Sequence, residues 1–352
     1  GSIRLFKVAG ISINVHITFF ILLILFLGAG IKWLFVIMGV FFFVTLHELS
    51  HSLVARHFGI TVKEITLLPI GGIASMTKMP EKPSEEFFIS IAGPLLNIAV
   101  VLLLYFPMYA FVGPDILHGF FINGPSLLTW KHAIVYVYWI NLILAAFNLI
   151  PAFPMDGGRI LRSILANSMG YRKATRVAVS FGHVFALLFG YWGIVNRNFI
   201  LIAIAVFIYM AASSEEMQVA VKETLRKFRV KDIISSNFLT LPKDATLSKV
   251  LELIFHSHQE DFPVIEGGKI TGFVTRKDIT NGIHEHGTSR VVSELMRTSF
   301  PVLRESDALD KAYNTMQENN IKALPVLRGE KVIGIVSLED ITRVYSVMAG
   351  RR

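Results

Sequence analysis

The sequence predicts an α-helical polytopic membrane protein of about six transmembrane helices with a membrane-associated β-hairpin, followed by a cytoplasmic α/β domain. The 352-residue chain is 53% hydrophobic and its mean hydropathy is +0.56, which is too high for a typical soluble globular protein. Its charges are unevenly spread. Residues 1–214 hold 14 Lys and Arg against 7 Asp and Glu, whereas residues 215–352 hold 20 against 19. The charged part also contains an internal repeat.

The net charge of +8 and the pI of 9.6 do not call for a nucleic-acid partner, and we expect none. Basic loops that face anionic cytoplasmic lipid account for this charge. The chain has no cysteine, so disulfides and thiolate zinc sites are excluded. Any metal must therefore be held by His, Asp or Glu.

Six apolar stretches are candidate membrane spans, since each approaches the roughly 20 residues that a bilayer core requires. They are Ile13–Gly30, Trp33–Phe58, Phe87–Val112, Ala133–Pro151, Val177–Val195 and Asn198–Ala212. A short interfacial helix is expected at Arg159–Ser168, after the fourth stretch. The first stretch is long and has no small-residue cleavage site after it, so we expect no cleaved signal peptide.

The loops between these stretches differ in positive charge. With a cytoplasmic N-terminus, the inside loops hold eleven Lys and Arg, and the outside loops hold three. This positive-inside bias predicts a multi-pass protein of the cell membrane whose N-terminus and C-terminal domain are cytoplasmic. The C-terminal end of the second stretch then lies near the cytoplasmic face.

The segment Ile60–Met76 has strand-like residues around a Pro69-Ile70-Gly71-Gly72 turn and predicts a β-hairpin that enters the membrane. Non-helical backbone at that depth is tolerated only where it packs on protein or lines a wet cavity. Its free edge could clamp an extended peptide by strand addition. The alternative is a hairpin that only plugs the site.

The charged part begins with an expected helical linker over residues 213–229, before the repeat. Gly272–Ile279 recurs as Gly334–Ile341, and Phe262-Pro263-Val264 recurs at the same offset as Leu324-Pro325-Val326. Each unit has the order helix, strand, glycine turn, strand, helix. We therefore divide the chain into a membrane domain over 1–212, the linker over 213–229 and a pseudo-twofold α/β domain over 230–352.

The second apolar stretch contains His47-Glu48-Leu49-Ser50-His51. Histidines at i and i+4 lie on one face of a helix and can bind one zinc ion, while the adjacent glutamate can take a proton from the attacking water. Ionisable groups at membrane depth are costly, which favours a function for all three. The motif predicts hydrolysis inside a membrane.

A catalytic zinc site needs three protein ligands and one open position. Asp156 is the candidate third ligand, because it follows the fourth stretch at the depth that the topology predicts for the histidines. Pro151 and Pro154 would break the helix there, and Gly157 would allow close backbone approach. The alternative is that Asp156 only caps a helix in a turn.

Three segments resemble the signatures of site-2 proteases: His47–His51, Gly93-Pro94-Leu95-Leu96-Asn97, and Asn148–Arg159. Six spans with a cytoplasmic tail are similar to the branch that includes the sporulation protease. The resemblance implies an intramembrane zinc metalloprotease with one Zn²⁺ per chain, held by His47, His51 and Asp156. It also implies that Asn148 lies near the scissile peptide, where it either binds the substrate or polarises the carbonyl, the alternative being a helix cap. For Asn97 we expect a packing role.

The repeat resembles a tandem pair of CBS domains, a Bateman module. In that family the Gly-x-x-Thr/Ser-x-x-Asp pattern lines a cleft for adenosine nucleotides, in which the Asp holds the ribose hydroxyls and the Thr or Ser lies near the phosphate. Thr275 with Asp278 and Ser337 with Asp340 match this pattern. The resemblance implies ATP, ADP or AMP as ligand and a homodimer formed through these domains. Some CBS pairs bind no nucleotide and only dimerise, which is the alternative.

These observations predict regulated intramembrane proteolysis: cleavage of a transmembrane protein substrate near the cytoplasmic face, with Glu48 as the catalytic base and control through the CBS pair. The competing hypothesis is a CBS-regulated metal or ion transporter, since two histidines and an aspartate in a membrane can also pass a metal. Glu48 discriminates between the two, because a transport pathway has no need of a glutamate beside the first ligand.

Overall fold

The structure, a computed structural model, describes residues 1–69, 71–76, 80, 82–123, 129–257 and 259–349. Two compact units are present, Gly1–Met217 and Gln218–Arg352. Ile70 of the expected turn and Lys78 of the inside loops lie outside the described residues.

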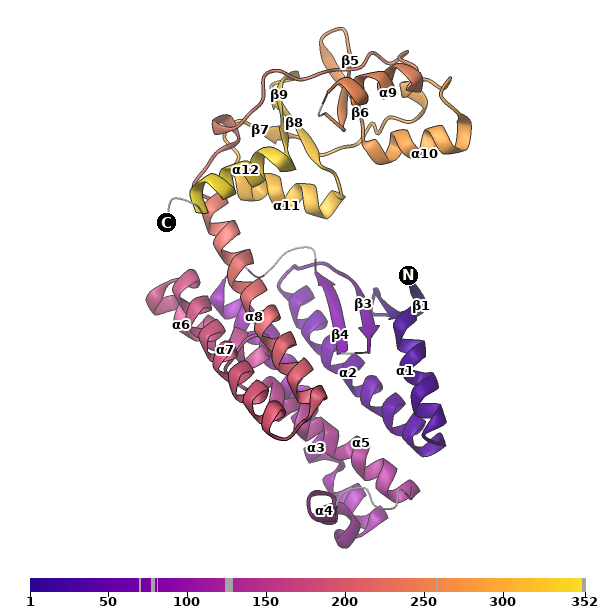
Figure 1. The fold of residues 1–352 in the computed structure, drawn as a ribbon, viewed down its shortest axis with the longest axis vertical. Helices are drawn as coiled ribbons and strands as arrows, with labels where there is room; N and C mark the ends of the chain where they lie inside the picture. The colour runs from indigo at the N-terminus through magenta and orange to yellow at the C-terminus, as the bar shows by residue number, and fades with distance from the viewer. Residues whose placement is uncertain (70, 77–79, 81, 124–128, 258, 350–352) are drawn as a thin grey trace. The chain divides into compact units, whose positions relative to one another are not determined.

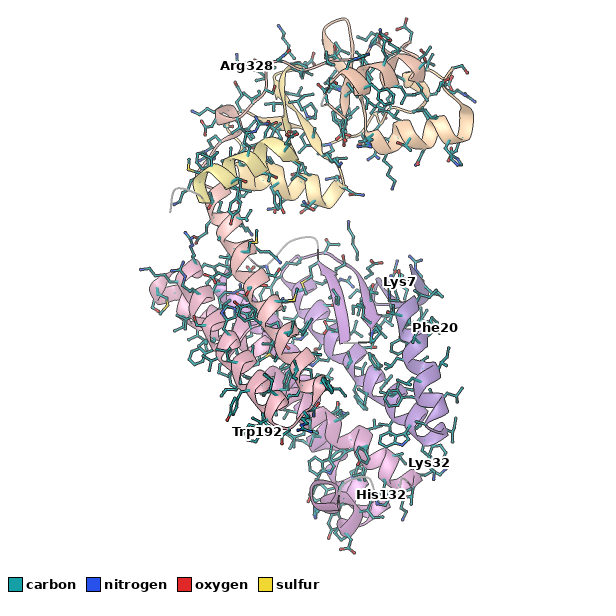
Figure 2. All side chains as sticks on the ribbon, in the orientation of Figure 1. Lys7, Phe20, Lys32, His132, Trp192 and Arg328 are labelled. Atoms are coloured by element: carbon teal, nitrogen blue, oxygen red, sulfur yellow. The ribbon has the colours of Figure 1, made fainter. Side chains whose placement is uncertain are left out.

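Five of the described helices are long and apolar enough to cross a membrane, by length and composition. They are α2 (Ile31–His57), α3 (Pro83–Val112), α5 (Trp130–Asn148), α7 (Tyr171–Val195) and α8 (Phe199–Leu225) (Figure 1). Many of their large apolar side chains point outward, such as that of Trp192, which is 66% exposed (Figure 2). A surface of this kind suits hydrocarbon and not water.

The first expected span is not a full-length helix. Its first residues belong to strand β2 (Ile11–His16), and α1 (Ile17–Gly28) has only 12 residues. At 1.5 Å per residue this helix is about 18 Å long, well short of a bilayer core of about 30 Å. The alternation of Ile11, Ile13 and Val15 with polar residues was the signal of a strand.

The expected hairpin is present as β3 (Val62–Leu68) and β4 (Gly71–Met76). It belongs to a larger sheet of order β1-β2-β3-β4, in which β1 (Ser2–Val8) pairs with β2 and β2 runs parallel to β3. Buried strand residues share one core cluster with helices α1 and α2, which includes Ile13, Ile65, Phe19 and Phe41. Strand β4 is at the edge of this sheet, so one side of its backbone is left unpaired by the sheet.

Helix α3 is the centre of the membrane unit, because it packs on α2, α5 and α6 (Asp156–Met169). The expected interfacial helix corresponds to α6. Helix α4 (Pro114–Asn123) lies between α3 and α5 in the chain. Helix α8 continues past Ala212 to Leu225, so the first part of the expected linker is helical.

The second unit consists of two similar halves. The first contains α9 (Leu247–His256), β5 (Phe262–Glu266), β6 (Lys269–Val274) and α10 (Arg276–His286). The second contains β7 (Leu303–Arg304), α11 (Leu309–Asn319), β8 (Ala323–Arg328), β9 (Lys331–Ser337) and α12 (Leu338–Ala349). One-turn 3₁₀ helices at Val230–Asp232 and Val292–Glu294 precede them.

The halves exchange their leading segments. Ser235, at the start of the first repeat, pairs with Ile335 of β9, whereas Arg297, at the start of the second repeat, pairs with Phe273 of β6. Ser235 and Arg297 hold equivalent positions of the repeat, and so do Phe273 and Ile335. The predicted repeat is therefore also a structural one, with a pseudo-twofold relation between the halves.

Candidate metal centre

Helix α2 brings the two predicted histidine ligands to one face. His47 and His51 are 5% and 6% exposed, and their Nε2 atoms are 3.1 Å apart. One turn of helix separates residues at i and i+4, which is why both rings reach the same point. Imidazoles buried in an apolar helix require polar partners for their ring nitrogens.

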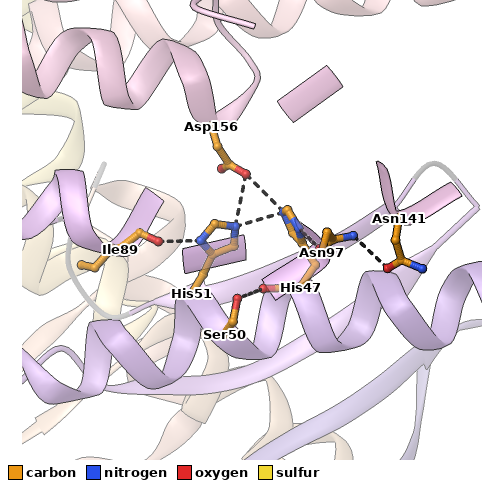
Figure 3. A network of polar contacts seen from close by, with 7 residues as sticks. All are labelled: His47, Ser50, His51, Ile89, Asn97, Asn141 and Asp156. Atoms are coloured by element: carbon orange, nitrogen blue, oxygen red, sulfur yellow. Dashed lines mark hydrogen bonds and ion pairs between the residues drawn. The ribbon is translucent and has the colours of Figure 1, made fainter. Parts of the chain in front are cut away.

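Asp156, the first residue of α6, completes the cluster (Figure 3). Its Oδ2 lies 3.2 Å from Nε2 of His47 and 3.2 Å from Nε2 of His51. Among the described residues, these three form the group of His, Asp and Glu side chains able to hold a metal. Tetrahedral zinc with bonds of 2.0–2.1 Å places its ligand atoms about 3.3 Å apart, so the observed triangle fits it and leaves a fourth position.

Hydrogen bonds from α3 fix the orientation of both rings. His51 Nδ1 lies 2.6 Å from the carbonyl oxygen of Ile89, and His47 Nδ1 lies 2.9 Å from Oδ1 of Asn97. Both partners only accept, so each Nδ1 carries the proton and donates it. Each Nε2 is then an unprotonated lone pair aimed at the Asp156 carboxylate. Three electron-pair donors this close together need a cation between them. Histidines oriented by a hydrogen bond from Nδ1 are typical of zinc sites.

A second amide supports the first. Asn97 donates from Nδ2 to Oδ1 of Asn141 on α5 at 3.2 Å, and Asn141 donates to the carbonyl oxygen of Val137 at 3.0 Å. Both asparagines are 0% exposed. Asn97 therefore does more than the packing role that we expected, because it holds the His47 ring.

Gly93 of α3 faces the two rings directly. A Cβ at this position would lie 2.6 Å from Nε2 and 2.6 Å from Cε1 of His47, and it would also overlap Nε2 of His51. Real Cβ atoms essentially never approach other heavy atoms within 3.0 Å. A residue without a Cβ is therefore required where α3 passes the histidines.

The loop between α5 and α6 presents Asp156 to the histidines. A Cβ at Gly157 would lie 2.5 Å from the carbonyl oxygen of Leu149 and would also overlap that of Ile150, so the start of α6 packs directly on the end of α5. Helix α5 ends at Asn148, before Pro151, as the prolines predicted. The close backbone approach expected at Gly157 is confirmed.

Arg162 anchors the helix that carries Asp156. Its guanidinium, buried in α6, donates from Nε to Oε1 of Glu86 on α3 at 2.9 Å, and from Nη1 to Oε1 of Glu215 on α8 at 2.7 Å. The rings of Phe153 and Tyr171 lie 4.7 and 4.6 Å from its central carbon. These contacts fix α6, and with it Asp156, to two neighbouring helices.

Glu48 lies on the flank of the metal-binding face of α2, about 100° round the helix from His47. It is partly buried, and a Cβ at Gly72 of β4 would lie 2.6 Å from its Cγ. The edge strand β4 therefore passes directly over the predicted base.

Asn148 is the last residue of α5 and is partly exposed. The structure gives its side chain no hydrogen-bond partner within the described ranges. The alternative prediction was that the Asn148 side chain caps the broken helix. No hydrogen bond supports it, since the backbone N–H of Leu149 caps the C-terminus of α5.

The four predicted nucleotide residues form two local pairs in the second unit. Thr275 donates to Oδ2 of Asp278 at 2.7 Å, and Ser337 donates to Oδ2 of Asp340 at 2.6 Å. Each pair closes the N-terminus of a helix in the manner of a capping box. Arg297 also donates to Asp278, through Nε and Nη2 at 2.9 Å each.

Several residues of the metal centre were not predicted from the sequence as supports of the metal ligands. They are Ile89, Gly93, Asn97, Asn141 and Arg162. A signal was present for three of them: buried amides and a buried cation in apolar helices must find partners. What the sequence does not give is which partner each of them finds.

Known proteins similar to this chain share both of its parts. A model described as Peptidase family M50 matches residues 35–123 and 123–189, and a CBS domain model matches residues 230–285 and 292–347. A zinc metalloprotease of Methanocaldococcus jannaschii is 37% identical over 354 residues, covering 99% of this chain and 97% of that protein. Stage IV sporulation protein FB of Bacillus subtilis is 25% identical over 257 residues, covering 72% of this chain and 80% of that protein.

Among solved structures, a site-2 protease from Methanocaldococcus jannaschii is 40% identical to this chain. The match covers 61% of this chain and 95% of that one, with a TM-score of 0.45.

Proposed function

This chain belongs to peptidase family M50, the site-2 protease family, with a tandem pair of CBS domains, and we propose that it cleaves transmembrane segments of other proteins near the cytoplasmic face. Family membership makes it a zinc metalloprotease and decides against the transport alternative. The proposal for its site rests on one observation, the triangle of Nε2, Nε2 and Oδ2 atoms from His47, His51 and Asp156.

In the proposed mechanism, His47, His51 and Asp156 hold one zinc ion, which when bound acts as a Lewis acid and eases deprotonation of the attacking water. Glu48 takes the proton of that water as it attacks the peptide carbonyl. It then delivers the proton to the departing amine. The position of Glu48 beside the ligand face of α2 supports this role.

Asn148 is proposed to hold the substrate. Its amide is free of hydrogen bonds within the described residues and sits at the end of α5, where Leu149 packs against the start of α6 beside Asp156. An amide N–H there can donate to the carbonyl oxygen of the substrate, whose negative charge rises during attack.

Strand β4 is proposed to bind the substrate in extended form. A helical segment must unwind before its peptide bond can be attacked, and the backbone groups released need partners in the membrane. The unpaired edge of β4 offers them by strand addition. The contact between Gly72 and Glu48 supports this route, because a peptide on this edge would run close to the base.

Cleavage near the cytoplasmic face is supported by the loops that follow α2, where the inside loops hold nine Lys and Arg and the outside loops hold two. The same count supports a cytoplasmic CBS pair. The pairing of β2 with β3, which follows the cytoplasmic end of α2, supports a cytoplasmic N-terminus. We further propose that adenine nucleotide binds the CBS pair at two sites, Thr275 with Asp278 and Ser337 with Asp340. Binding of this nucleotide is proposed to control cleavage. The CBS domains are also proposed to form a homodimer. The paired hydroxyl and carboxylate groups at the start of α10 and α12 support the nucleotide sites.

The deciding experiment is cleavage of a co-expressed single-span membrane protein by the Glu48→Gln variant, with zinc content measured on the purified protein. The expected result is about one zinc per chain and a loss of cleavage of at least about 100-fold, the contribution of a positioned general base. The control is Glu252→Gln, at an exposed glutamate of α9 that pairs with Lys249. Cleavage by Glu48→Gln at the wild-type rate would refute the proposed mechanism.

A further inference from the structure

Among the equivalent positions at which the two halves of the CBS pair differ, one pair determines what contacts the predicted ribose-binding carboxylates. Arg297 and Ser235 are equivalent in the repeat, and each starts a leading segment that pairs with a strand of the opposite half. The strand partner of Arg297 is Phe273, which shortly precedes Asp278. The strand partner of Ser235 is Ile335, which precedes Asp340 by the same interval.

The carboxylate of Asp278 has little capacity left for a ligand. Its Oδ2 accepts from the Thr275 backbone N–H at 3.1 Å, from the Thr275 hydroxyl at 2.7 Å and from Arg297 Nε at 2.9 Å. Its Oδ1 accepts from Arg297 Nη2 at 2.9 Å. A carboxylate has about two acceptor positions on each oxygen, so Oδ2 is filled and Oδ1 keeps one open position, too few for the two hydroxyls of a ribose. The two-pronged arginine contact is the geometry that Arg and carboxylate prefer.

The carboxylate of Asp340 is less occupied. Its Oδ2 accepts from the backbone N–H and the hydroxyl of Ser337, at 3.0 and 2.6 Å. No other hydrogen bond to this carboxylate is found within the described residues. The equivalent of Arg297 is Ser235, whose hydroxyl donates instead to the carbonyl oxygen of Asn237 at 3.2 Å. Two acceptor positions thus stay open for the two hydroxyls of a ribose.

On the basis of the nucleotide binding proposed above, we infer that the two clefts select ligands of different charge: the Asp340 cleft accepts an adenosine nucleoside with or without phosphate, whereas the Asp278 cleft accepts only a phosphorylated one. The inference depends on the proposed function, since it concerns the same pair of nucleotide sites.

The physical reason is competition for the Asp278 carboxylate. A ribose can bind Asp278 only after Arg297 has left it, and a neutral nucleoside offers the displaced guanidinium no new partner. A phosphate does, because it binds a guanidinium in the same two-pronged way. The side chains of Arg297 and Asp278 are 39% and 19% exposed, so a ligand from solvent can reach and exchange this ion pair.

The test is calorimetric titration of the 352-residue chain in detergent with adenosine and with AMP. We expect about one adenosine per chain, bound where the Asp340 carboxylate has open acceptor positions. We expect about two AMP per chain, because AMP also binds at Asp278. Arg297→Ser makes the first cleft like the second and should raise adenosine binding to about two per chain. Ser235→Arg makes the second like the first, so adenosine binding should be lost while AMP still binds.

Two controls accompany these exchanges. Arg290→Ser removes an exposed arginine of the same unit that pairs with Glu294, and it should leave all stoichiometries unchanged. Arg297→Gln keeps a long polar side chain without charge. It should bind adenosine as Arg297→Ser does. Agreement between the two variants would show that loss of the arginine charge, and not misfolding, causes the change in adenosine binding.

The outcomes separate the two proposals. Two adenosine sites in the wild-type protein, or one in both Arg297→Ser and Arg297→Gln, would overturn the inferred selectivity and leave nucleotide binding standing. Absence of AMP binding to the wild-type protein and to both exchange variants would overturn the proposed nucleotide sites and the selectivity with them.

Discussion

The substitution Gly93→Ala should weaken zinc binding at least about 100-fold although Gly93 is no metal ligand. The added Cβ would lie 2.6 Å from Nε2 of His47, whereas real Cβ atoms essentially never come within 3.0 Å and ordinary contact begins at 3.4 Å. It would overlap Nε2 of His51 as well. Both rings are held from behind by α3, so they cannot turn away without losing a hydrogen bond.

The size of the effect follows from the tolerance of the metal. Zinc–nitrogen bonds lie within about 0.2 Å of their preferred length of about 2.0–2.1 Å. Relief of the overlap must move a ring by several tenths of an ångström, which exceeds that tolerance. Loss of an outer support alone costs about 10–100-fold in metal affinity. Displacement of two ligands should cost at least the upper value, about 2.8 kcal/mol.

The assay compares zinc affinity by chelator competition with cleavage of a membrane substrate, on purified protein. Gly190→Ala in α7 is the matched control, because its Cβ would meet only the Cβ of Ala205 at 3.7 Å, an ordinary contact. This control should keep both properties. If Gly93→Ala binds zinc with wild-type affinity and cleaves at the wild-type rate, α3 does not pass the histidines as closely as the structure requires.

Three further predictions concern the supports of each site. Asn97→Ala should lower zinc affinity about 10–100-fold, measured by chelator competition, because the His47 ring loses its acceptor. Arg162→Ala should lower the free energy of unfolding by about 3–5 kcal/mol, measured by thermal denaturation, since buried Glu86 loses its cation; an unchanged midpoint would contradict this. Burial opposes ionisation of Asp278, but hydrogen bonds from Arg297 and Thr275 outweigh it and hold the pKa of this carboxyl below its usual value. Because the folded pKa is the lower one, the stabilisation is present above about pH 4 and is lost as the pH falls through the folded pKa. Asp278→Asn should remove this acid-dependent part of the melting curve.

The residues that carry the chemistry were accessible from the sequence because they obey local rules. Histidines at i and i+4 meet on one face of a helix whatever surrounds it. The stretch around His47 is apolar, and ionisable groups in such a stretch are costly, so their presence predicts a function. The internal repeat likewise identified equivalent positions before any fold was known. Membership in peptidase family M50 and the CBS pair agree with the predicted resemblance.

What the sequence left open depends on how elements meet. The first apolar stretch proved to be a strand and a short helix, because Ile11 and Ile13 pair with β1 and β3 in a sheet. The mean hydropathy of a stretch does not distinguish an apolar strand from an apolar helix, so the two elements together were predicted as one span. The link between Asn97 and His47 is also a matter of helix packing, which a single sequence does not specify.

Helix α3 explains how a chain can bury this cluster at an acceptable cost. It supplies no ligand, yet the carbonyl of Ile89, the bare backbone of Gly93 and the amide of Asn97 recur every four residues along one stripe facing the histidines. One turn before Ile89, Glu86 binds Arg162 and so holds the helix of Asp156. One stripe of one helix therefore orients all three ligands. It follows that the identity of residues on this stripe, and not the hydrophobicity of α3 as a whole, determines whether the metal site forms.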